Sequence, residues 1–290
     1  MLRNKINTNL TISENDYTFL NTLDPNINKI YLIIQQHILS NSYNCNINSI
    51  SIWYEFDQLG LIINYNQSKN PSTNLSTNLS ADASTNSTKQ IAKIIYENGY
   101  KLKILGYKNN SFDSKIAYII NNYFEIYNYK MSINSFRQPF TYISDLANQI
   151  VKSEIKDNFF GLGGESGLIC KRNMDIITKY HLITDNSNIH MDFLSNGFDQ
   201  LNIELVNYKN LGDDYWSNLV YENWLLFVNI SKTGLKLMAK YIRLFNSIVY
   251  VGCDSNTIKT DIIGLSKYYT LRKNIQITSN NFILIFDKII

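Results

Sequence analysis

A glycine-rich turn, GLGGESG at residues 161–167, follows an expected strand (FFGLG) and opens an expected helix. Glycines at such a turn let the backbone approach a nucleotide at the N-terminus of the helix. Gly161, Gly163 and Gly164 are therefore candidate binding residues. Asp185 lies 22 positions beyond Gly163, near the ~20 residues typical of a carboxylate that hydrogen-bonds ribose hydroxyls. This spacing does not separate S-adenosylmethionine from NAD, and a tight turn followed by a surface Asp would also produce it.

Polar residues also follow two later expected strands. NISKTG (229–234) comes after NWLLFV, and GCDSNT (252–257) comes after SIVYV. Cys253 is a candidate nucleophile, because a loop after a strand favours exposure and the dipole of the following helix favours the thiolate form. On the residues alone, an ordinary small buried cysteine is the better interpretation.

From residue 136 onward, apolar strands alternate with helices. This alternation predicts an α/β fold with a parallel, doubly wound, Rossmann-like sheet that binds ligands at the carboxyl ends of its strands. An amphipathic helix is expected in PFTYISDLANQIVKSEI, and the tail NNFILIFDKII is expected to form a last strand. The expected strands between them are FFGLG, HLIT (181–184), NIELVN (202–207), NWLLFVN (223–229) and SIVYVG (247–252).

The first part of the chain is expected to be a small α+β domain over residues 1–130, which precedes the Rossmann-like domain of residues 131–290. SISIWYEF and LGLIINYN are typical of two strands of a hairpin, and KQIAKIIYENG is typical of a short amphipathic helix that ends at Gly99. The tract at residues 68–89, rich in Asn, Ser and Thr, has little apolar surface to bury and is expected to be a disordered loop.

Composition limits the partners of the chain. A net charge of +3 and a pI of about 8.5 permit a nucleic-acid partner without implying one. The three cysteines and three histidines show no metal-ligand spacing, so we expect no metal site. No apolar run approaches the ~20 residues that span a bilayer, and no signal-peptide pattern is present. We expect a cytoplasmic protein without membrane contact, of cellular origin or a viral protein in its host's cytoplasm; the oligomeric state stays open.

The later motifs carry a resemblance to a known family. VYVGCDSNTIKTDIIGL is similar to a block of the uracil-5 RNA methyltransferases, in which Ser-Cys-Asn-Pro-x-Thr precedes a helix. NISKTG stands where that family carries Asp-Pro-Pro-Arg-x-Gly, and Ser135-Phe-Arg-Gln138 resembles its Ser-Phe-x-Gln. The resemblance runs from about residue 50 to the end, because the hairpin, helix and edge strands of residues 50–130 follow the order of the family's central insert.

The resemblance implies an S-adenosylmethionine-dependent methyltransferase that acts on transfer or ribosomal RNA. Cys253 would add to carbon 6 of uracil, so that carbon 5 becomes nucleophilic, and a base would later remove the carbon 5 proton. Asn229 stands in place of an Asp that contacts the target base, and Lys232 in place of the family's Arg. Gln138 would contact both cofactor and base, and the cofactor-binding set would also include Asn229, Asp185 and the glycines of the turn.

The chain departs from the family in several places. No N-terminal RNA-binding barrel fits into the first 45 residues, the cysteines of the iron–sulfur centre are missing, and Ile230 and Ser231 replace two prolines. The C-terminal Glu that acts as the base is also missing, since no Glu follows Glu222. Asp254 or Asp287 could take its place, with no positional reason to prefer either. Three hypotheses stay open: an active uracil-5 methyltransferase, an inactive relative that serves as an RNA-binding or structural subunit, and a methyltransferase with another target for which Cys253 is incidental.

Overall fold

The structure is a computed structural model, and it describes residues 4–7, 25–40, 47–55, 58–65, 76–109, 116–132, 135, 141–208, 212, 215, 223–230, 234–235, 242 and 245–289. Its contacts divide the chain into two units, Met1–Phe124 and Glu125–Ile290. The division falls six residues before the one expected at 130/131. Each unit is described by itself below.

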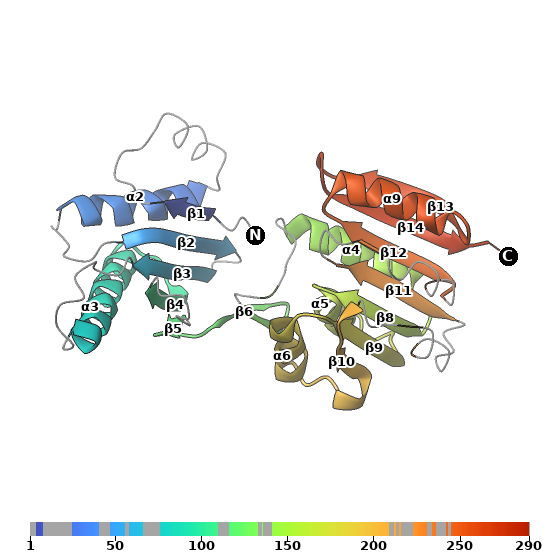
Figure 1. The fold of residues 1–290 in the computed structure, drawn as a ribbon, viewed down its shortest axis with the longest axis horizontal. Coiled ribbons are helices and arrows are strands. Elements are labelled where there is room, and N and C mark those ends of the chain that lie inside the picture. Colours follow the sequence, from blue (N-terminus) through green and yellow to red (C-terminus); the bar gives the residue numbers. More distant parts are fainter. Residues whose placement is uncertain are drawn as a thin grey trace. The chain divides into compact units, whose positions relative to one another are not determined.

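The second unit is built on a seven-stranded sheet (Figure 1). Its strands are β8 (Asn158–Gly163), β9 (Lys179–Thr184), β10 (Ile203–Leu205), β11 (Trp224–Asn229), β12 (Ser247–Gly252), β13 (Tyr269–Gln276) and β14 (Phe282–Lys288). They lie in the order β10-β9-β8-β11-β12-β14-β13, and the first five are parallel. The expected strands and the parallel arrangement are thereby confirmed.

Both faces of this sheet are buried, because alternate residues of each strand point to opposite sides. Phe159 of β8 and Phe227 of β11 belong to one core, whereas the neighbouring Phe160 and Leu226 belong to the other. Figure 1 shows the helices that cover the sheet. The first core contains residues of α4 (Thr141–Glu154), α5 (Ser166–Arg172) and α6 (Ser187–Ser195), and the second contains residues of α9 (Ser255–Leu265).

The C-terminal strand β14 lies between β12 and β13 and runs antiparallel to both. Its pairing with β12 sets Asp287 opposite Ser247 and Phe282 opposite Gly252. The chain thus turns back after β13 and inserts its last strand into the sheet. Sequence reasoning predicted a last strand here but not its direction or its place.

The first unit has a five-stranded sheet in the order β1-β2-β3-β4-β5. The hairpin of β2 and β3 is antiparallel, as predicted, and β3 pairs in parallel with β4. Residues of two helices, α2 and α3, pack on this sheet in one core. The elements of this unit are β1 (Asn4–Asn7), α2 (Pro25–Ser40), β2 (Ile47–Glu55), β3 (Gln58–Tyr65), α3 (Ser76–Glu97), β4 (Leu102–Asn109) and β5 (Ala117–Tyr118).

The expectation of a disordered loop over residues 68–89 is wrong for its second part, because α3 begins at Ser76; residues 68–75 lie outside the described ranges. The hydroxyl groups of the tract find partners on the sheet. Thr88 Oγ1 lies 2.9 Å from the Tyr65 hydroxyl, and Thr85 Oγ1 donates to the Tyr107 hydroxyl at 2.9 Å. The tract therefore has tertiary contacts that its composition does not indicate.

Candidate functional site

Four candidate residues fall on one edge of the large sheet. Asp185, Gly163, Asn229 and Cys253 end or directly follow β9, β8, β11 and β12, which are neighbours in that order. Because these strands are parallel, their carboxyl ends meet at the same edge, where ligands of open α/β sheets bind. The fold thus brings together residues that span 90 positions of the sequence, from 163 to 253.

The glycine-rich turn is held against the end of β11. Gly163 has a φ of +82°, and a Cβ atom there would lie 2.4 Å from the carbonyl oxygen of Asn229. The amide of Gly164 donates to that same carbonyl at 2.7 Å. Only glycine allows both this backbone conformation and this close approach. The turn is therefore fixed to the neighbouring strand by the backbone itself.

The other glycines of the turn make room for protein atoms. A Cβ atom on Gly161 would lie 2.6 Å from Cβ of Ser166, and one on Gly167 would lie 2.5 Å from the Tyr129 hydroxyl. These two glycines allow α5 to pack tightly on β8 and on the segment before α4. Close packing between helix and strand is thus the role that the structure gives to Gly161 and Gly167.

A buried carboxylate, Glu165, links the turn to two other elements. Glu165 is 1% exposed. Its Oε2 accepts from the Ser144 hydroxyl at 2.8 Å and from the side-chain Nδ2 of Asn229 at 3.4 Å. Asn229 itself is fully buried. The side chain of Asn229, which the resemblance assigns to a target base, points in this structure into the protein and bonds a carboxylate that sequence reasoning missed.

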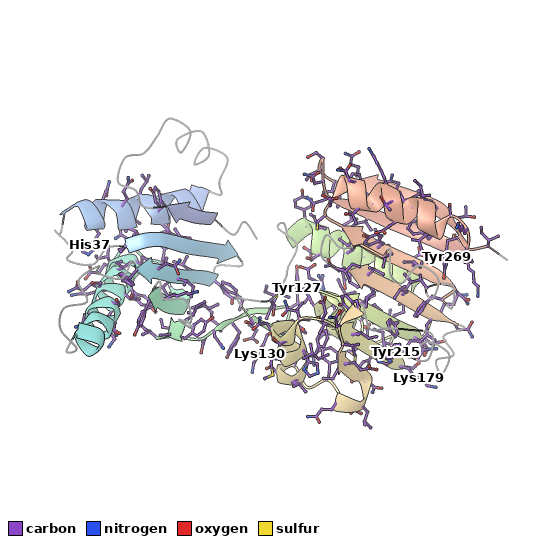
Figure 2. The ribbon with its side chains drawn as sticks, in the orientation of Figure 1. His37, Tyr127, Lys130, Lys179, Tyr215 and Tyr269 are labelled. Atoms are coloured by element: carbon purple, nitrogen blue, oxygen red, sulfur yellow. The ribbon has the colours of Figure 1, made fainter. Side chains whose placement is uncertain are left out.

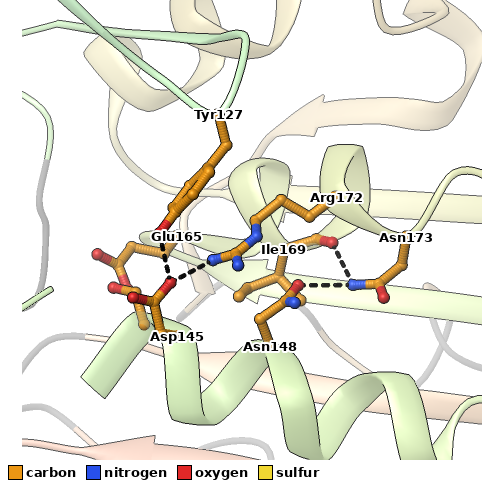
Figure 3. Close-up of polar contacts among 8 residues, drawn as sticks. Tyr127, Asp145, Asn148, Glu165, Ile169, Arg172 and Asn173 are labelled. Atoms are coloured by element: carbon orange, nitrogen blue, oxygen red, sulfur yellow. Dashed lines mark hydrogen bonds and ion pairs between the residues drawn. The ribbon is translucent and has the colours of Figure 1, made fainter. Parts of the chain in front are cut away.

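A polar cluster beside Glu165 joins three segments of the second unit (Figure 3). Asp145 of α4 accepts from Arg172 Nη1 at 2.8 Å and from the Tyr127 hydroxyl at 2.9 Å. The guanidinium of Arg172 also lies 3.9 Å from the centre of the Tyr127 ring. Tyr127 is in the turn between β6 (Tyr123–Ile126) and β7 (Tyr129–Ser132), so this cluster ties that hairpin to α4 and α5.

Asp185 occupies the position expected of a ribose-binding carboxylate. It is exposed directly after β9, and the next residue, Asn186, caps α6 by accepting from the amides of Asn188 and Ile189. Partial burial raises the pKa of Asp185 above its ordinary value. The carboxylate is thus held by a capped helix and remains accessible at the sheet edge.

Cys253 follows β12 and is partly exposed. The next residue, Asp254, is the N-cap of α9, where its Oδ1 accepts from the Thr257 amide at 2.8 Å. The cap leaves Cys253 between the end of a strand and the N-terminus of an eleven-residue helix. Asp254 already has a structural role in this arrangement.

A second buried carboxylate, Asp261 of α9, fixes the loop after β11. Both of its oxygens accept from the Leu235 amide at 3.0 Å, and Oδ2 accepts from the Tyr250 hydroxyl at 2.7 Å. Gly234, with a φ of +67°, leaves room for it, because a Cβ atom there would lie 2.8 Å from Asp261 Oδ2. Asp261 thereby holds Gly234 and Leu235 against the helix that follows Cys253.

Asp287 and Cys253 lie at opposite ends of the strands: Asp287 is next to the start of β12, and Cys253 follows the end of β12. Asp287 pairs with Ser247, at the start of β12, and Arg272 Nε bonds its Oδ2 at 2.9 Å. Cys253 follows the other end of that strand. Six residues of strand at about 3.3 Å each separate the two positions by roughly 20 Å. The candidate base Asp287 is therefore too far away to serve a nucleophile at Cys253.

The segment that leads into α4 is anchored to α6. The Ser135 hydroxyl donates to Asp192 Oδ2 at 2.5 Å, and the Ser132 amide donates to Oδ1 at 2.9 Å. Lys130, which Figure 2 labels, is in β7 of the β6–β7 hairpin. The backbone of Lys130 exchanges two hydrogen bonds of 2.7 Å with the side chain of Asn196. Burial raises the pKa of Asp192 to about 6. The contact places Ser135 beside the helix that follows Asp185.

Two candidates, Gln138 and Lys232, lie outside the described residues. Among the residues that are described, no group of three His, Cys, Asp or Glu side chains could hold a metal ion. None of the described helices combines the length and apolar character that crossing a bilayer requires.

Strand order and site together define the class of fold. Five parallel strands, a last strand inserted antiparallel next to the edge, and a glycine turn after the first strand form the Rossmann-like fold of S-adenosylmethionine-dependent methyltransferases. The chain is similar to the Pyrococcus abyssi tRNA (uracil-54, C5)-methyltransferase solved with S-adenosyl-L-homocysteine. That likeness has a TM-score of 0.59 and 12% identity, and it covers 90% of this chain and 67% of the other.

A second similar structure is Trm5b from Pyrococcus abyssi, with a TM-score of 0.49, 10% identity, and coverage of 85% of this chain and 80% of the other. No protein-family model and no curated protein matches the chain. The likeness to the first of these two structures supports the fold alone.

Proposed function

We propose that the protein is an S-adenosylmethionine-dependent RNA methyltransferase that modifies carbon 5 of uracil. The observation that supports this proposal is the row of Asp185, Gly163, Asn229 and Cys253 at the carboxyl edge of the sheet. A glycine turn, an exposed carboxylate and a thiol thus share one edge, which supports the proposed roles in binding nucleotide, ribose and uracil. The Pyrococcus abyssi tRNA (uracil-54, C5)-methyltransferase, to which the chain is similar, is named for this chemistry.

The residues present fit the cofactor. The exposed carboxylate of Asp185 can accept hydrogen bonds from ribose hydroxyls. Gly163 and Gly164 are held on the neighbouring strand by backbone contacts and have no side chains that would keep a cofactor away from the turn. Gln138 completes the proposed binding set, together with two residues that act by shaping the turn: Gly161, which lets α5 pack on β8, and Asn229, whose backbone carbonyl holds Gly164. The cofactor supplies an electrophilic methyl group when it is bound.

The protein's own contribution to the chemistry centres on Cys253. Its thiolate would form a bond to carbon 6 of uracil, which moves the electron pair of the 5,6 double bond onto carbon 5 and makes that carbon nucleophilic. After methylation, a base must remove the carbon 5 proton, and the thiolate leaves as the double bond forms again. Lys232 is proposed to orient the base; Asn229 could join it only if its buried side chain turned away from Glu165.

The reaction can be tested on RNA directly. Total RNA from the protein's own cells or host, and transcripts of transfer and ribosomal RNA, are incubated with the protein and S-adenosylmethionine carrying a deuterated methyl group. Mass spectrometry of the nucleosides should show labelled 5-methyluridine. Cys253→Ser should abolish the product while it leaves cofactor binding unchanged, because the thiol is placed in the methyl-transfer step alone. Labelled product from Cys253→Ala would instead indicate a methyltransferase with another chemistry.

A second function, an inactive relative that binds RNA or cofactor, is favoured by the environment of the site. Asn229 is buried and bonded to Glu165, Asp254 caps α9, and Asp287 lies at the far edge. Cofactor binding without any labelled nucleoside would support this alternative.

A further inference from the structure

We propose that a groove on the first unit, between α3 and β4, binds a single-stranded segment of the RNA substrate. The proposal rests on the proposed RNA methyltransferase function and names a contact surface for its substrate. The groove has a volume of about 530 Å³ and is lined by Lys89, Ala92, Lys93, Tyr96, Glu97, Leu105, Ile119 and Ile120.

The floor of the groove is apolar and carries an aromatic ring. Ala92 and Leu105 are buried, whereas Tyr96 is 47% exposed although it is a large aromatic side chain. Nucleobases offer flat apolar faces, and proteins bind single strands by stacking them on such rings. The groove therefore offers a surface suited to the faces of bases.

The charge around the groove is complementary to phosphate. Residues 89–108, which include most of its lining, carry five lysines and one glutamate, a net charge of +4 in a chain whose total is +3. The glutamate, Glu97, forms an exposed ion pair with Lys93 at 3.8 Å, which is worth little in water. Of these five lysines, Lys89 and Lys93 on α3 line the groove, and the other three lie at residues 101–108, in and next to β4. The five lysines are Lys89, Lys93, Lys101, Lys103 and Lys108.

Both features together favour RNA over a protein partner. An apolar groove alone would suit a hydrophobic peptide. Such a peptide, unless it is acidic, has no negative charge with which the lysines at the rim could interact. A nucleic-acid strand places phosphates outside and bases inside, and the groove has the same distribution, with lysines on the exposed face of α3 and apolar side chains below. Tyr96 lines the groove together with Lys89 and Lys93.

The test measures RNA binding by the full chain with a fluorescein-labelled oligouridylate and fluorescence anisotropy, without cofactor. Tyr96→Ala should weaken binding roughly 5- to 100-fold, which corresponds to the stacking of about one base, while Tyr96→Phe should retain it. Lys89→Ala should weaken binding and reduce the salt dependence by about one phosphate contact, a slope of ~0.7. Lys29→Ala is the matched control, because Lys29 is an exposed lysine of α2 in the same unit.

The outcomes separate this inference from the proposed reaction. Wild-type binding that falls in Tyr96→Ala and Lys89→Ala, but not in Lys29→Ala, supports the groove whether or not 5-methyluridine is ever formed. Equal binding by all variants, an equal loss in Lys29→Ala, or no binding by the wild type overturns the groove as an RNA site. In the last case, cofactor binding and methyl transfer to RNA or to another target still decide the proposed function by themselves.

Discussion

Replacement of Asp192 by Asn should change how the stability of the second unit depends on pH. Asp192 is 6% exposed and accepts hydrogen bonds from Ser135 and Ser132. Burial raises its pKa from 3.8 to about 6. Because the folded state holds the proton more tightly than the unfolded state, the contribution of Asp192 to stability is fully present below pH 4 and is lost as the pH rises past about 6.

The size of the effect follows from the shift. About two pKa units correspond to roughly 3 kcal/mol of unfolding free energy between the protonated and ionised limits. The amide of Asn resembles the protonated carboxyl group, since it can accept from the Ser132 amide and donate to the Ser135 hydroxyl. Asp192→Asn should therefore match the wild type near pH 4 and exceed its stability by about 3 kcal/mol at pH 8.

Urea unfolding followed by tryptophan fluorescence can measure this difference. With Trp53 replaced by Phe in all proteins, the remaining Trp216 and Trp224 both report the second unit. Asp157→Asn serves as the control, because Asp157 is an exposed aspartate of the same unit. The reasoning is refuted if the wild type and Asp192→Asn lose stability in parallel between pH 4 and pH 8, or if the variant is the less stable protein at pH 8.

Three further substitutions test the site by urea unfolding in the same background. Gly163→Ala should lower the unfolding free energy by more than ~2 kcal/mol, because it adds a steric clash to an unfavourable φ. Gly197→Ala is the control, since Gly197 has a similar φ of +76° and nothing within 4 Å of an added Cβ, and it should show the cost of φ alone. Equal losses in the two variants would contradict the clash. Tyr250→Phe should cost about 1.5–3 kcal/mol, since it removes a hydrogen bond to buried Asp261, and a neutral result would contradict that contact. Glu165→Ala leaves two buried donors without this acceptor and should cost at least ~1 kcal/mol; unchanged stability would show that the link is unimportant.

The strands of the second unit could be predicted from the sequence because their signal is local. FFGLG, NWLLFV and SIVYV are continuous apolar runs, as strands buried on both faces require. The glycine turn and Asp185 could be predicted from their spacing along the chain. The place of β14 between β12 and β13 could not, because an apolar run does not encode which neighbour it pairs with or in which direction.

The buried carboxylates could not be predicted for the same reason. Asp192 meets Ser135 across 57 residues, and Glu165 meets Asn229 across 64, so neither pair leaves a local pattern. Asp261 reads as an ordinary helix residue, and only Gly234 hints that the chain is crowded there. The helix over residues 76–89 was missed because its contacts, such as the hydrogen bonds to Tyr65 of β3 and Tyr107 of β4, are not visible in its own composition.

The central claim, a cofactor site at the carboxyl edge of the sheet, is tested most directly by calorimetric titration of the full chain with S-adenosylmethionine. The account predicts binding to one site per chain, weakened roughly tenfold or more in Asp185→Ala through the loss of charged hydrogen bonds to ribose, with Asp157→Ala as the exposed control. A folded wild-type protein that binds neither S-adenosylmethionine nor S-adenosyl-L-homocysteine, or that binds them equally well without the Asp185 carboxylate, would contradict it.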